Sequence, residues 1–360
     1  MYKKEIILAF LSFVVTASLM ETYFRLFPET LPPALSNHLT SRYHDGLTGI
    51  YRYDFGLNMY LMKPNYECQM LFNGYRWHHH TNSMGFRNPH DFSRADILLL
   101  GDSMIYGHGV EETSTIRYFL NQILHQNIIN MGMQGICIHQ EYQLLKHFGL
   151  ALHPKYVLVF FLQNDIHDLT VHLSDEEMQR FLELPVSDHT TPYSKGAIIS
   201  HDWWDPVVQY LNELYLIKMG KLLKHYLTKG MTSAYAETFD EYDWKGHALF
   251  QVQPRLRLAM KFHLHALLKM QNLAQQHNMT LIHIFIYTGM NKEANIYKKI
   301  LSLFCQKHLI SFFSLEDGFK DAINRKQDVF LTQNNDGHFS QQGAELAAKL
   351  VAQYLQTRSE

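Results

Sequence analysis

Short runs of apolar residues that stop at glycine or polar residues recur along this chain from about residue 97. Three of them occupy residues 97–100, 128–129 and 156–161, and each is followed by glycine, asparagine or aspartate within a few positions. Runs of this length with such boundaries predict buried strands of a parallel sheet. Two later runs, at 280–287 and 309–315, predict two further strands.

Segments typical of helices separate these runs. The first of these segments has Thr113 or Ser114 as its N-cap and ends at residue 124. The others cover residues 140–147, 255–277, 293–308 and 341–356. Strands and helices that alternate at spacings of about 30 residues indicate right-handed βαβ units. We therefore expect an α/β fold with a mainly parallel sheet.

The first 27 residues have a different pattern. Residues 6–20 carry no charge and follow Lys3 and Lys4. This predicts an uncleaved membrane anchor whose positive flank stays in the cytoplasm, so that the rest of the chain is extracytoplasmic, or periplasmic in a Gram-negative cell. Two alternatives stay open. One is a signal peptide cleaved near Ala17, which would give a secreted protein, and the other is a buried core helix.

Breaks in the pattern suggest the domain organisation. Three prolines within residues 28–33 end any helix that continues from the anchor, so residues 28–92 are expected to form a stem and an N-terminal extension. Residues 93–358 then form the main domain. The alternation of strand and helix fails over residues 169–251, which predicts a helical insertion. It either folds over the functional site or simply packs onto the sheet.

Composition narrows the function classes. The chain has 360 residues, 46% hydrophobic and 18% charged, which is enough for a sizeable core. A formal charge of −2 with no basic cluster argues against a nucleic-acid partner. The three cysteines are far apart and form neither a metal motif nor a disulfide framework. Successive side chains of residues 78–80 diverge in any regular backbone, so this histidine run does not predict a metal site, and no cofactor is expected.

Candidate chemistry lies where the predicted strands end. Ser103 follows the run at 97–100, Gly135 follows 128–129, Asn164 follows 156–161, and Asp336 and His338 precede the last helix. The carboxyl ends of parallel strands meet at one edge of a sheet, which is where such folds bind ligands. Asp336 and His338 stand two apart, so in an extended or turn segment the acid can orient the imidazole. A simple turn with a helix cap is the alternative interpretation of residues 101–103.

This ordered set resembles the SGNH (GDSL-type) family of serine esterases and acyltransferases. The resemblance implies a three-layer α/β/α, flavodoxin-like fold with Ser103 as nucleophile and His338 as base. It also implies an oxyanion hole formed by Ser103, Gly135 and Asn164. Many members have Asp-x-x-His, whereas this chain has Asp-x-His, like the branch that includes polysaccharide O-acetylation proteins. Asp336 is thus the expected acid of the triad.

The expected function is an ester hydrolase that acts on oxygen esters through an acyl-serine, with a small-molecule or glycan ester as substrate. Asp102 is expected to support the loop by accepting hydrogen bonds from N–H groups, so that Ser103 is aimed correctly. An O-acyltransferase and a catalytically inactive carbohydrate-binding relative are the alternatives. An α/β-hydrolase is excluded because Ser103 lacks the flanking Gly-x-Ser-x-Gly motif. The sequence does not indicate whether the protein has protein partners.

Overall fold

The computed structural model describes residues 2–190, 210–229, 254–288, 292–333 and 336–358. The chain divides into two compact units, each of which is described here by itself. One comprises Met1–Arg52, Met70–Arg76 and Ala197–Glu241, and the other comprises Tyr53–Gln69, Trp77–Gly196 and Tyr242–Glu360.

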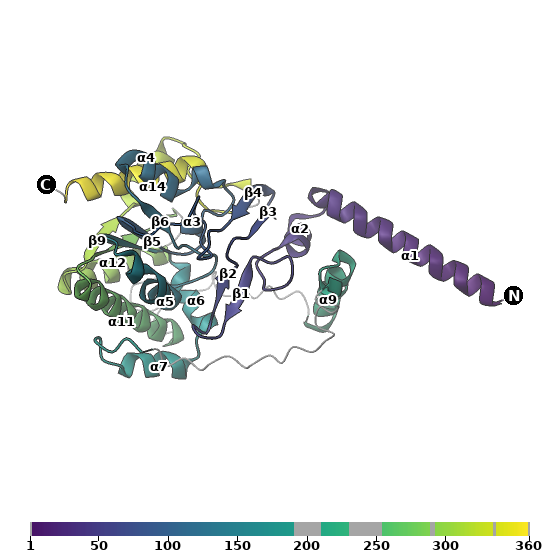
Figure 1. Ribbon diagram of the computed structural model, residues 1–360, viewed down its shortest axis with the longest axis horizontal. Coiled ribbons are helices and arrows are strands. Elements are labelled where there is room, and N and C mark those ends of the chain that lie inside the picture. The colour runs from purple at the N-terminus through teal and green to yellow at the C-terminus, as the bar shows by residue number, and fades with distance from the viewer. Residues whose placement is uncertain (1, 191–209, 230–253, 289–291, 334–335, 359–360) are drawn as a thin grey trace. The chain divides into compact units, whose positions relative to one another are not determined.

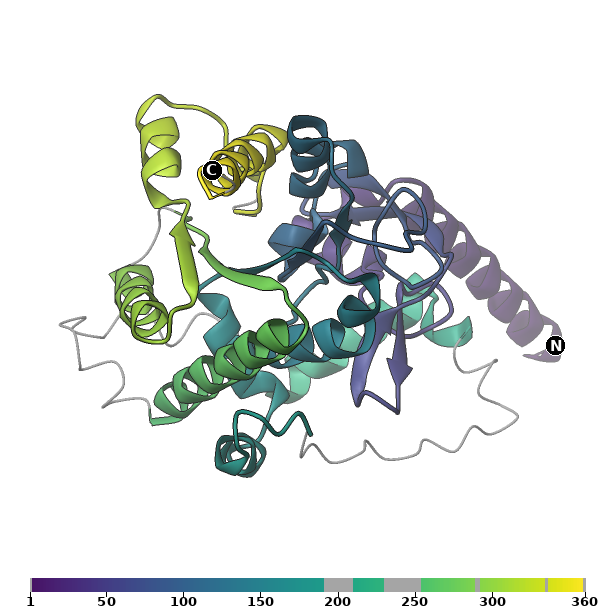
Figure 2. The ribbon, with the colours of Figure 1, turned by 60° about the vertical axis from the view of Figure 1, so that its left-hand side comes forward.

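Five parallel strands form the central sheet of the larger unit. Their order is β6-β5-β7-β8-β9, so the chain places its second strand on one side of the first and all later strands on the other (Figure 2). This is the flavodoxin-like order, which creates a crevice outside the carboxyl ends of the strands where the direction reverses. The strands are β5 (Ile97–Leu100), β6 (Ile128–Asn130), β7 (Tyr156–Phe161), β8 (Thr280–Phe285) and β9 (Ser311–Ser314).

Helices cover both faces of this sheet, as Figure 1 shows for α4 and α14 on one side and α11 on the other. The predicted α/β fold with three layers is therefore confirmed. On the first face, the small residues of α14 allow it to pack closely against α4 and the sheet. The helices of the first face are α4 (Ile116–Leu124), α13 (Glu316–Asn324) and α14 (Gln341–Gln356), and those of the second are α5 (Ile138–Leu144), α6 (Asn164–His172), α11 (Pro254–Gln276) and α12 (Lys292–Lys307).

The remaining elements are short. Two two-stranded sheets precede the central sheet in the chain, and a four-residue helix follows β5. These elements are β1 (Tyr51–Asp54), β2 (Met59–Met62), β3 (Glu67–Phe72), β4 (Tyr75–His80), α3 (Ser103–Tyr106), η2 (Glu112–Ser114), η3 (Leu145–Gly149), η4 (Leu150–Leu152) and α7 (Asp175–Glu183).

The predicted elements agree with the observed ones to within a few residues, with one error at a helix start. Helix α4 begins after Thr115, whose side chain accepts a hydrogen bond from the backbone N–H of Tyr118. Thr113 and Ser114, the expected caps, lie instead in the short helix η2. Serine and threonine both cap helices well, so the local sequence did not distinguish between the three residues.

The smaller unit contains α1 (Tyr2–Leu26), η1 (Pro28–Thr30), α2 (Pro33–Thr40) and α9 (Tyr215–Lys229). The span of α1 from Lys4 to Leu26 is 23 residues long and apolar enough to cross a membrane, and none of it is buried. Near its carboxyl end, Glu21 accepts hydrogen bonds from the first backbone N–H groups of α9, at Tyr215 and Leu216. Arg25 also donates to the carbonyl of Glu213.

The segment expected to be an insertion contributes helices to both units. Helix α9 belongs to the smaller unit. Helix α7 instead packs on α11 in the larger unit, where the rings of Phe181 and Phe262 stack with centroids 4.3 Å apart. Residues 191–209 and 230–253, which make up much of the expected insertion, lie outside the described part of the chain. The domain boundaries expected from the sequence stay predictions.

Buried histidines in strand β8 and helix α11 make the stability of the fold sensitive to acid. His283 on β8 is fully buried beside His263, and burial lowers its pKa to about 4 despite a hydrogen bond with the carbonyl of Val159. In the unfolded chain a histidine takes up its proton near pH 6.5. The folded state therefore binds fewer protons than the unfolded state between these values, and stability is lost as pH falls through this window.

We expect His283→Phe to remove this pH dependence. Relative to the variant, the wild-type protein should lose about 3 kcal/mol of unfolding free energy as the pH falls from 7 to 4. Chemical denaturation at several pH values would measure this difference. The exposed His277 offers the matched control, His277→Phe, for which no such trend is expected. A difference that stays constant with pH would show that His283 is not held neutral.

Candidate active site

Ser103 lies at the first position of α3, directly beyond the carboxyl end of β5. The preceding residue, Asp102, is the N-cap of this helix, and its Oδ1 accepts a hydrogen bond of 2.9 Å from the backbone N–H of Met104. The cap and the candidate nucleophile therefore lie in one turn. Asp102 accepts a hydrogen bond from an N–H group of this turn, and its expected role in aiming Ser103 stays a prediction.

His338 reaches the same edge of the sheet from a loop before α14. The loop is held by Ser340, which caps α14, and by paired backbone hydrogen bonds between Leu331 and the residues around His338. Phe339 is buried and its ring stacks on that of Phe330. These contacts fix the backbone on both sides of His338, so its imidazole has a defined direction.

The structure brings Ser103, His338 and Asp336 together in one chain of hydrogen bonds. The Oγ of Ser103 lies 2.8 Å from Nε2 of His338, although the two residues are 235 positions apart. The other ring nitrogen, Nδ1, lies 2.6 Å from Oδ1 of Asp336. With Nδ1–H donating to this carboxylate, Nε2 is left unprotonated and can accept the proton of the hydroxyl.

Asp336 is built to remain a carboxylate. Its side chain is fully buried, and burial alone would raise its pKa. The neighbouring ring of His108 and the hydrogen bond with His338 outweigh this effect and hold the pKa of Asp336 well below its usual range. The negative charge beside His338 is therefore present at every pH at which a protein of this kind remains folded.

The oxyanion donors expected from the sequence lie in three different environments. The backbone N–H groups of Ser103 and Gly135 donate to no other described residue. Gly135 has a φ of 67°, in the left-handed region that favours glycine, and an added Cβ would meet no atom within 4 Å. Asn164, at the first turn of α6, directs its amide elsewhere. Its Nδ2 donates to Asp168 at 2.9 Å and to Asp102 at 3.4 Å.

Four carboxyl groups lie around this amide and the nucleophile turn, three of them buried and that of Asp168 partly buried. Burial raises the pKa of Asp102, Asp165, Asp168 and Glu141, and it outweighs the hydrogen bonds that Asp102 and Asp168 accept. A raised pKa shifts each group toward its uncharged form, and less negative charge next to Ser103 favours a developing oxyanion. For Asn164 to stabilise an oxyanion, one of its two hydrogen bonds must be exchanged for one to the substrate.

We expect Asn164→Ala to lower kcat by about 100- to 1,000-fold with little change in KM, if the amide serves the oxyanion. The measurement is steady-state ester hydrolysis by folded protein. Asp168→Asn is the control. The side-chain oxygen of the new asparagine can still accept the hydrogen bond from Asn164, so kcat should change far less. If Asn164 only joined the two carboxyl groups, Asn164→Ala would instead lower thermal stability and leave kcat unchanged.

One neighbour of the triad was missed by the sequence analysis. His108 is buried five positions after Ser103, and its ring stacks on that of His338 with centroids 4.1 Å apart. Its Nε2 lies 3.5 Å from Oδ2 of Asp336, and its Nδ1 lies 2.9 Å from Nε2 of Gln134. The only local signal for it is a histidine between two glycines, Gly107 and Gly109, directly after the nucleophile turn.

The atoms of His108, Asp336 and His338 also lie within 4.8 Å of one another, a spacing that a metal ion could use. The bond between Asp336 and His338 and the contact with Gln134 already engage these groups, however. In the run of three histidines, His79 points inward to the hydroxyl of Tyr106, whereas His78 contacts Glu67. Neighbouring side chains in this run therefore diverge, as the sequence predicted.

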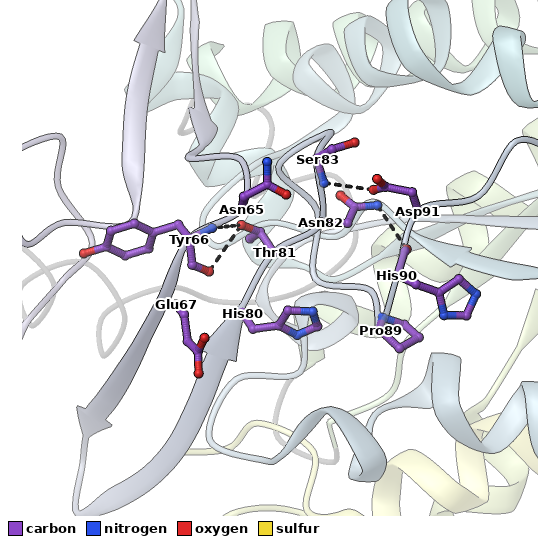
Figure 3. Close-up of a pocket in the computed structure, with 10 residues that line it drawn as sticks. All are labelled: Asn65, Tyr66, Glu67, His80, Thr81, Asn82, Ser83, Pro89, His90 and Asp91. Atoms are coloured by element: carbon purple, nitrogen blue, oxygen red, sulfur yellow. Dashed lines mark hydrogen bonds between the residues drawn. The ribbon is translucent and has the colours of Figure 1, made fainter.

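Residues 82–91 connect the N-terminal segment to the nucleophile turn. Arg87 is buried and donates to four backbone carbonyls, among them that of Gly107. A surface pocket of about 430 Å³ is lined in part by this same segment (Figure 3). It is lined by Asn65, Tyr66, Glu67, His80, Thr81, Asn82, Ser83, Pro89, His90 and Asp91, and none of the candidate catalytic residues lines it.

No family model and no curated protein matches the chain. Among solved structures, it is similar to a GDSL-like lipase from Bacteroides thetaiotaomicron at 10% identity, with 73% of this chain and 88% of that one covered and a TM-score of 0.37. It is also similar to an acetylxylan esterase from Geobacillus stearothermophilus at 10% identity, with 73% and 94% covered and a TM-score of 0.39. The solved structures that the chain is similar to include GDSL-like lipases and esterases.

Proposed function

We propose that this protein is a serine ester hydrolase that acts on oxygen esters through an acyl-serine intermediate. The observation that supports it most is the continuous path from the hydroxyl of Ser103 through His338 to the carboxylate of Asp336, with distances of 2.8 and 2.6 Å. A free serine hydroxyl is a weak nucleophile, and a base at this distance with a third group to orient it is what activates it.

The reaction follows from these positions. As Oγ of Ser103 attacks the ester carbonyl, its proton passes to Nε2 of His338, and the carboxylate of Asp336 stabilises the imidazolium that forms. The carbonyl oxygen becomes an oxyanion within reach of the N–H groups of Ser103 and Gly135 and, after rotation, of the Asn164 amide. The intermediate collapses when His338 returns the proton to the leaving alcohol, which leaves an acyl group on Ser103. Water, deprotonated by His338, then releases the acid.

The acyl-enzyme can also be resolved by a sugar hydroxyl, which would make the protein an O-acyltransferase. We favour hydrolysis of an O-acyl group, including one carried by a carbohydrate, and treat transfer as the alternative that one experiment separates. The full-length protein would be reacted with p-nitrophenyl acetate, and its deacylation rate would be measured with and without an oligosaccharide acceptor. A faster deacylation with an acetylated sugar as product would establish transfer, whereas an unchanged rate supports hydrolysis.

A fluorophosphonate, which forms a stable adduct with activated serines, tests the proposed function directly. We expect stoichiometric labelling of the wild-type protein at Ser103, identified by peptide mass spectrometry. A wild-type protein that is folded but neither labelled nor active on short acyl esters would support the third interpretation, an inactive carbohydrate-binding relative.

We further propose that α1 is an uncleaved membrane anchor with the catalytic unit outside the cytoplasm. The support is the exposed apolar length of α1, together with the contacts of Glu21 and Arg25 with α9, which give its carboxyl end a partner in the folded protein. Protease treatment of spheroplasts should degrade the catalytic unit, and carbonate extraction should leave the protein in the membrane. Release of a shortened protein would indicate signal-peptide cleavage.

A further inference from the structure

The carboxylate of Asp336 faces two histidines, although the proposed mechanism uses only one. His338 lies 2.6 Å from Oδ1, and Nε2 of His108 lies 3.5 Å from Oδ2. The side chains of Asp336 and His108 are almost fully buried, whereas that of His338 is 23% exposed. His108 therefore belongs to the inner side of the site, away from any approaching ester.

The position of His108 is fixed by its surroundings. Gly107 has a φ of 83°, and its backbone turns the chain back so that the N–H of His108 donates to the carbonyl of Ser103. The ring stacks on that of His338 with centroids 4.1 Å apart, and it meets the ring of Trp77 at an angle of 54° with centroids 4.9 Å apart. A ring packed in this way cannot move without disturbing the base.

Gln134 determines which nitrogen of His108 carries the proton. Its amide nitrogen, which can only donate, lies 2.9 Å from Nδ1, so Nδ1 accepts and the proton resides on Nε2. With the proton on Nε2, the ring turns a partial positive charge toward Oδ2 of Asp336 at 3.5 Å, a polar contact that does not meet the geometry of a hydrogen bond. The opposite tautomer would place the Nε2 lone pair against a carboxylate, which is repulsive. Burial also lowers the pKa of His108, so the ring is neutral and adds no second positive charge beside His338.

We propose that His108 is a positioning residue for the reaction, which holds the second oxygen of Asp336 and thereby fixes the carboxylate that orients His338. Gln134 sets the tautomer that makes this possible. Gln134 directly precedes Gly135, so the same chain of polar contacts joins the proposed oxyanion loop to the acid of the triad. This inference rests on the proposed ester chemistry and assigns a role in it that the sequence motifs do not contain.

The first test compares two substitutions at His108. His108→Phe keeps an aromatic ring beside His338 but removes the donor to Asp336. We expect kcat to fall about 10- to 100-fold with KM nearly unchanged, the effect of losing a polar contact with a buried charge. His108→Gln retains an N–H donor and should recover most of the rate. Equal losses in both variants, or a wild-type rate in His108→Phe, would overturn the proposal.

A double-mutant cycle shows whether His108 acts through Asp336. In an Asp336→Asn background, His108→Phe should cause little further loss of kcat, because the carboxylate that it positions is already gone. Independent multiplication of the two losses would mean that His108 merely supports the fold. Gln134→Leu removes the hydrogen bond to Nδ1 of His108 without changing either stacked ring. We expect kcat to fall two- to tenfold, about the effect of losing one neutral hydrogen bond.

A spectroscopic measurement on the wild-type protein makes the test independent of catalysis. With ¹⁵N-labelled histidine, His108, assigned by comparison with His108→Gln, should show a protonated Nε2 and an unprotonated Nδ1. In Gln134→Leu the two tautomers should mix. A proton on Nδ1 in wild type would refute the proposal, even if esterase activity were found. If no ester were hydrolysed and no fluorophosphonate bound, the proposed function would fail, and the tautomer of His108 would still be measured.

Discussion

Ser103→Ala is expected to lower ester hydrolysis by a factor on the order of 10⁶ and to abolish fluorophosphonate labelling. The reason is that no other described hydroxyl is within hydrogen-bond distance of His338 Nε2, which lies 2.8 Å from Oγ of Ser103. The residual rate would come from substrate binding and oxyanion donors alone. Initial rates on p-nitrophenyl acetate, normalised to folded protein, measure the effect.

The matched control for this experiment is Ser83→Ala. Ser83 is an exposed serine that lines the surface pocket in Figure 3 and lies apart from the triad. The Ser83→Ala variant should hydrolyse esters and react with fluorophosphonate as the wild-type protein does. Persistent acyl-enzyme formation in Ser103→Ala would assign the nucleophile to another residue and would reject the proposed mechanism.

Asp336→Asn is expected to lower kcat by about 10³- to 10⁴-fold while leaving KM nearly unchanged. An amide at this position can present its nitrogen to Nδ1 of His338, which would drive the ring into the tautomer that has no free lone pair at Nε2. The loss should persist at every pH at which the protein is folded, because the pKa of Asp336 lies well below its usual range and the wild-type carboxylate is never neutralised there.

Asp317→Asn, an exposed carboxylate in the first turn of α13, controls for a general effect of removing a negative charge. It should leave kcat within a factor of about two, as expected for a surface substitution outside the site. A near-normal rate in Asp336→Asn would assign the orienting role to another acid. In the structure, no other carboxylate among the described residues makes a hydrogen bond with His338.

Much of the larger unit was predictable from local patterns. The apolar runs gave all five strands of the central sheet, and α11 and α12 begin and end within one residue of the expected limits. These elements are buried on one or both faces, so their sequences have to be apolar at a regular period. The positions of Ser103, Gly135, Asn164 and His338 after the predicted strands also led to the expectation that they meet at one sheet edge, and the structure brings Ser103 and His338 within 2.8 Å of each other.

The errors and omissions occur where distant contacts decide the outcome. His108 looked like part of a glycine-containing turn, and only the fold places Gln134 and Asp336 on either side of its ring. The direction of the Asn164 amide depends on two carboxyl groups, one of which lies 62 positions away. The helix α9 belongs with the N-terminal elements because Glu21 binds its first turn, a pairing with no local signature.

The sequence by itself thus determined the type and order of the elements and which side chains end the strands, because those features follow from periodicity and from backbone geometry near each residue. The tertiary structure alone decided the tautomers, the shared carboxylate of Asp336 and the partners of the oxyanion donors. Hydrogen bonds act over about 3 Å and depend on direction. They are therefore specified only when segments from different parts of the chain are packed against one another.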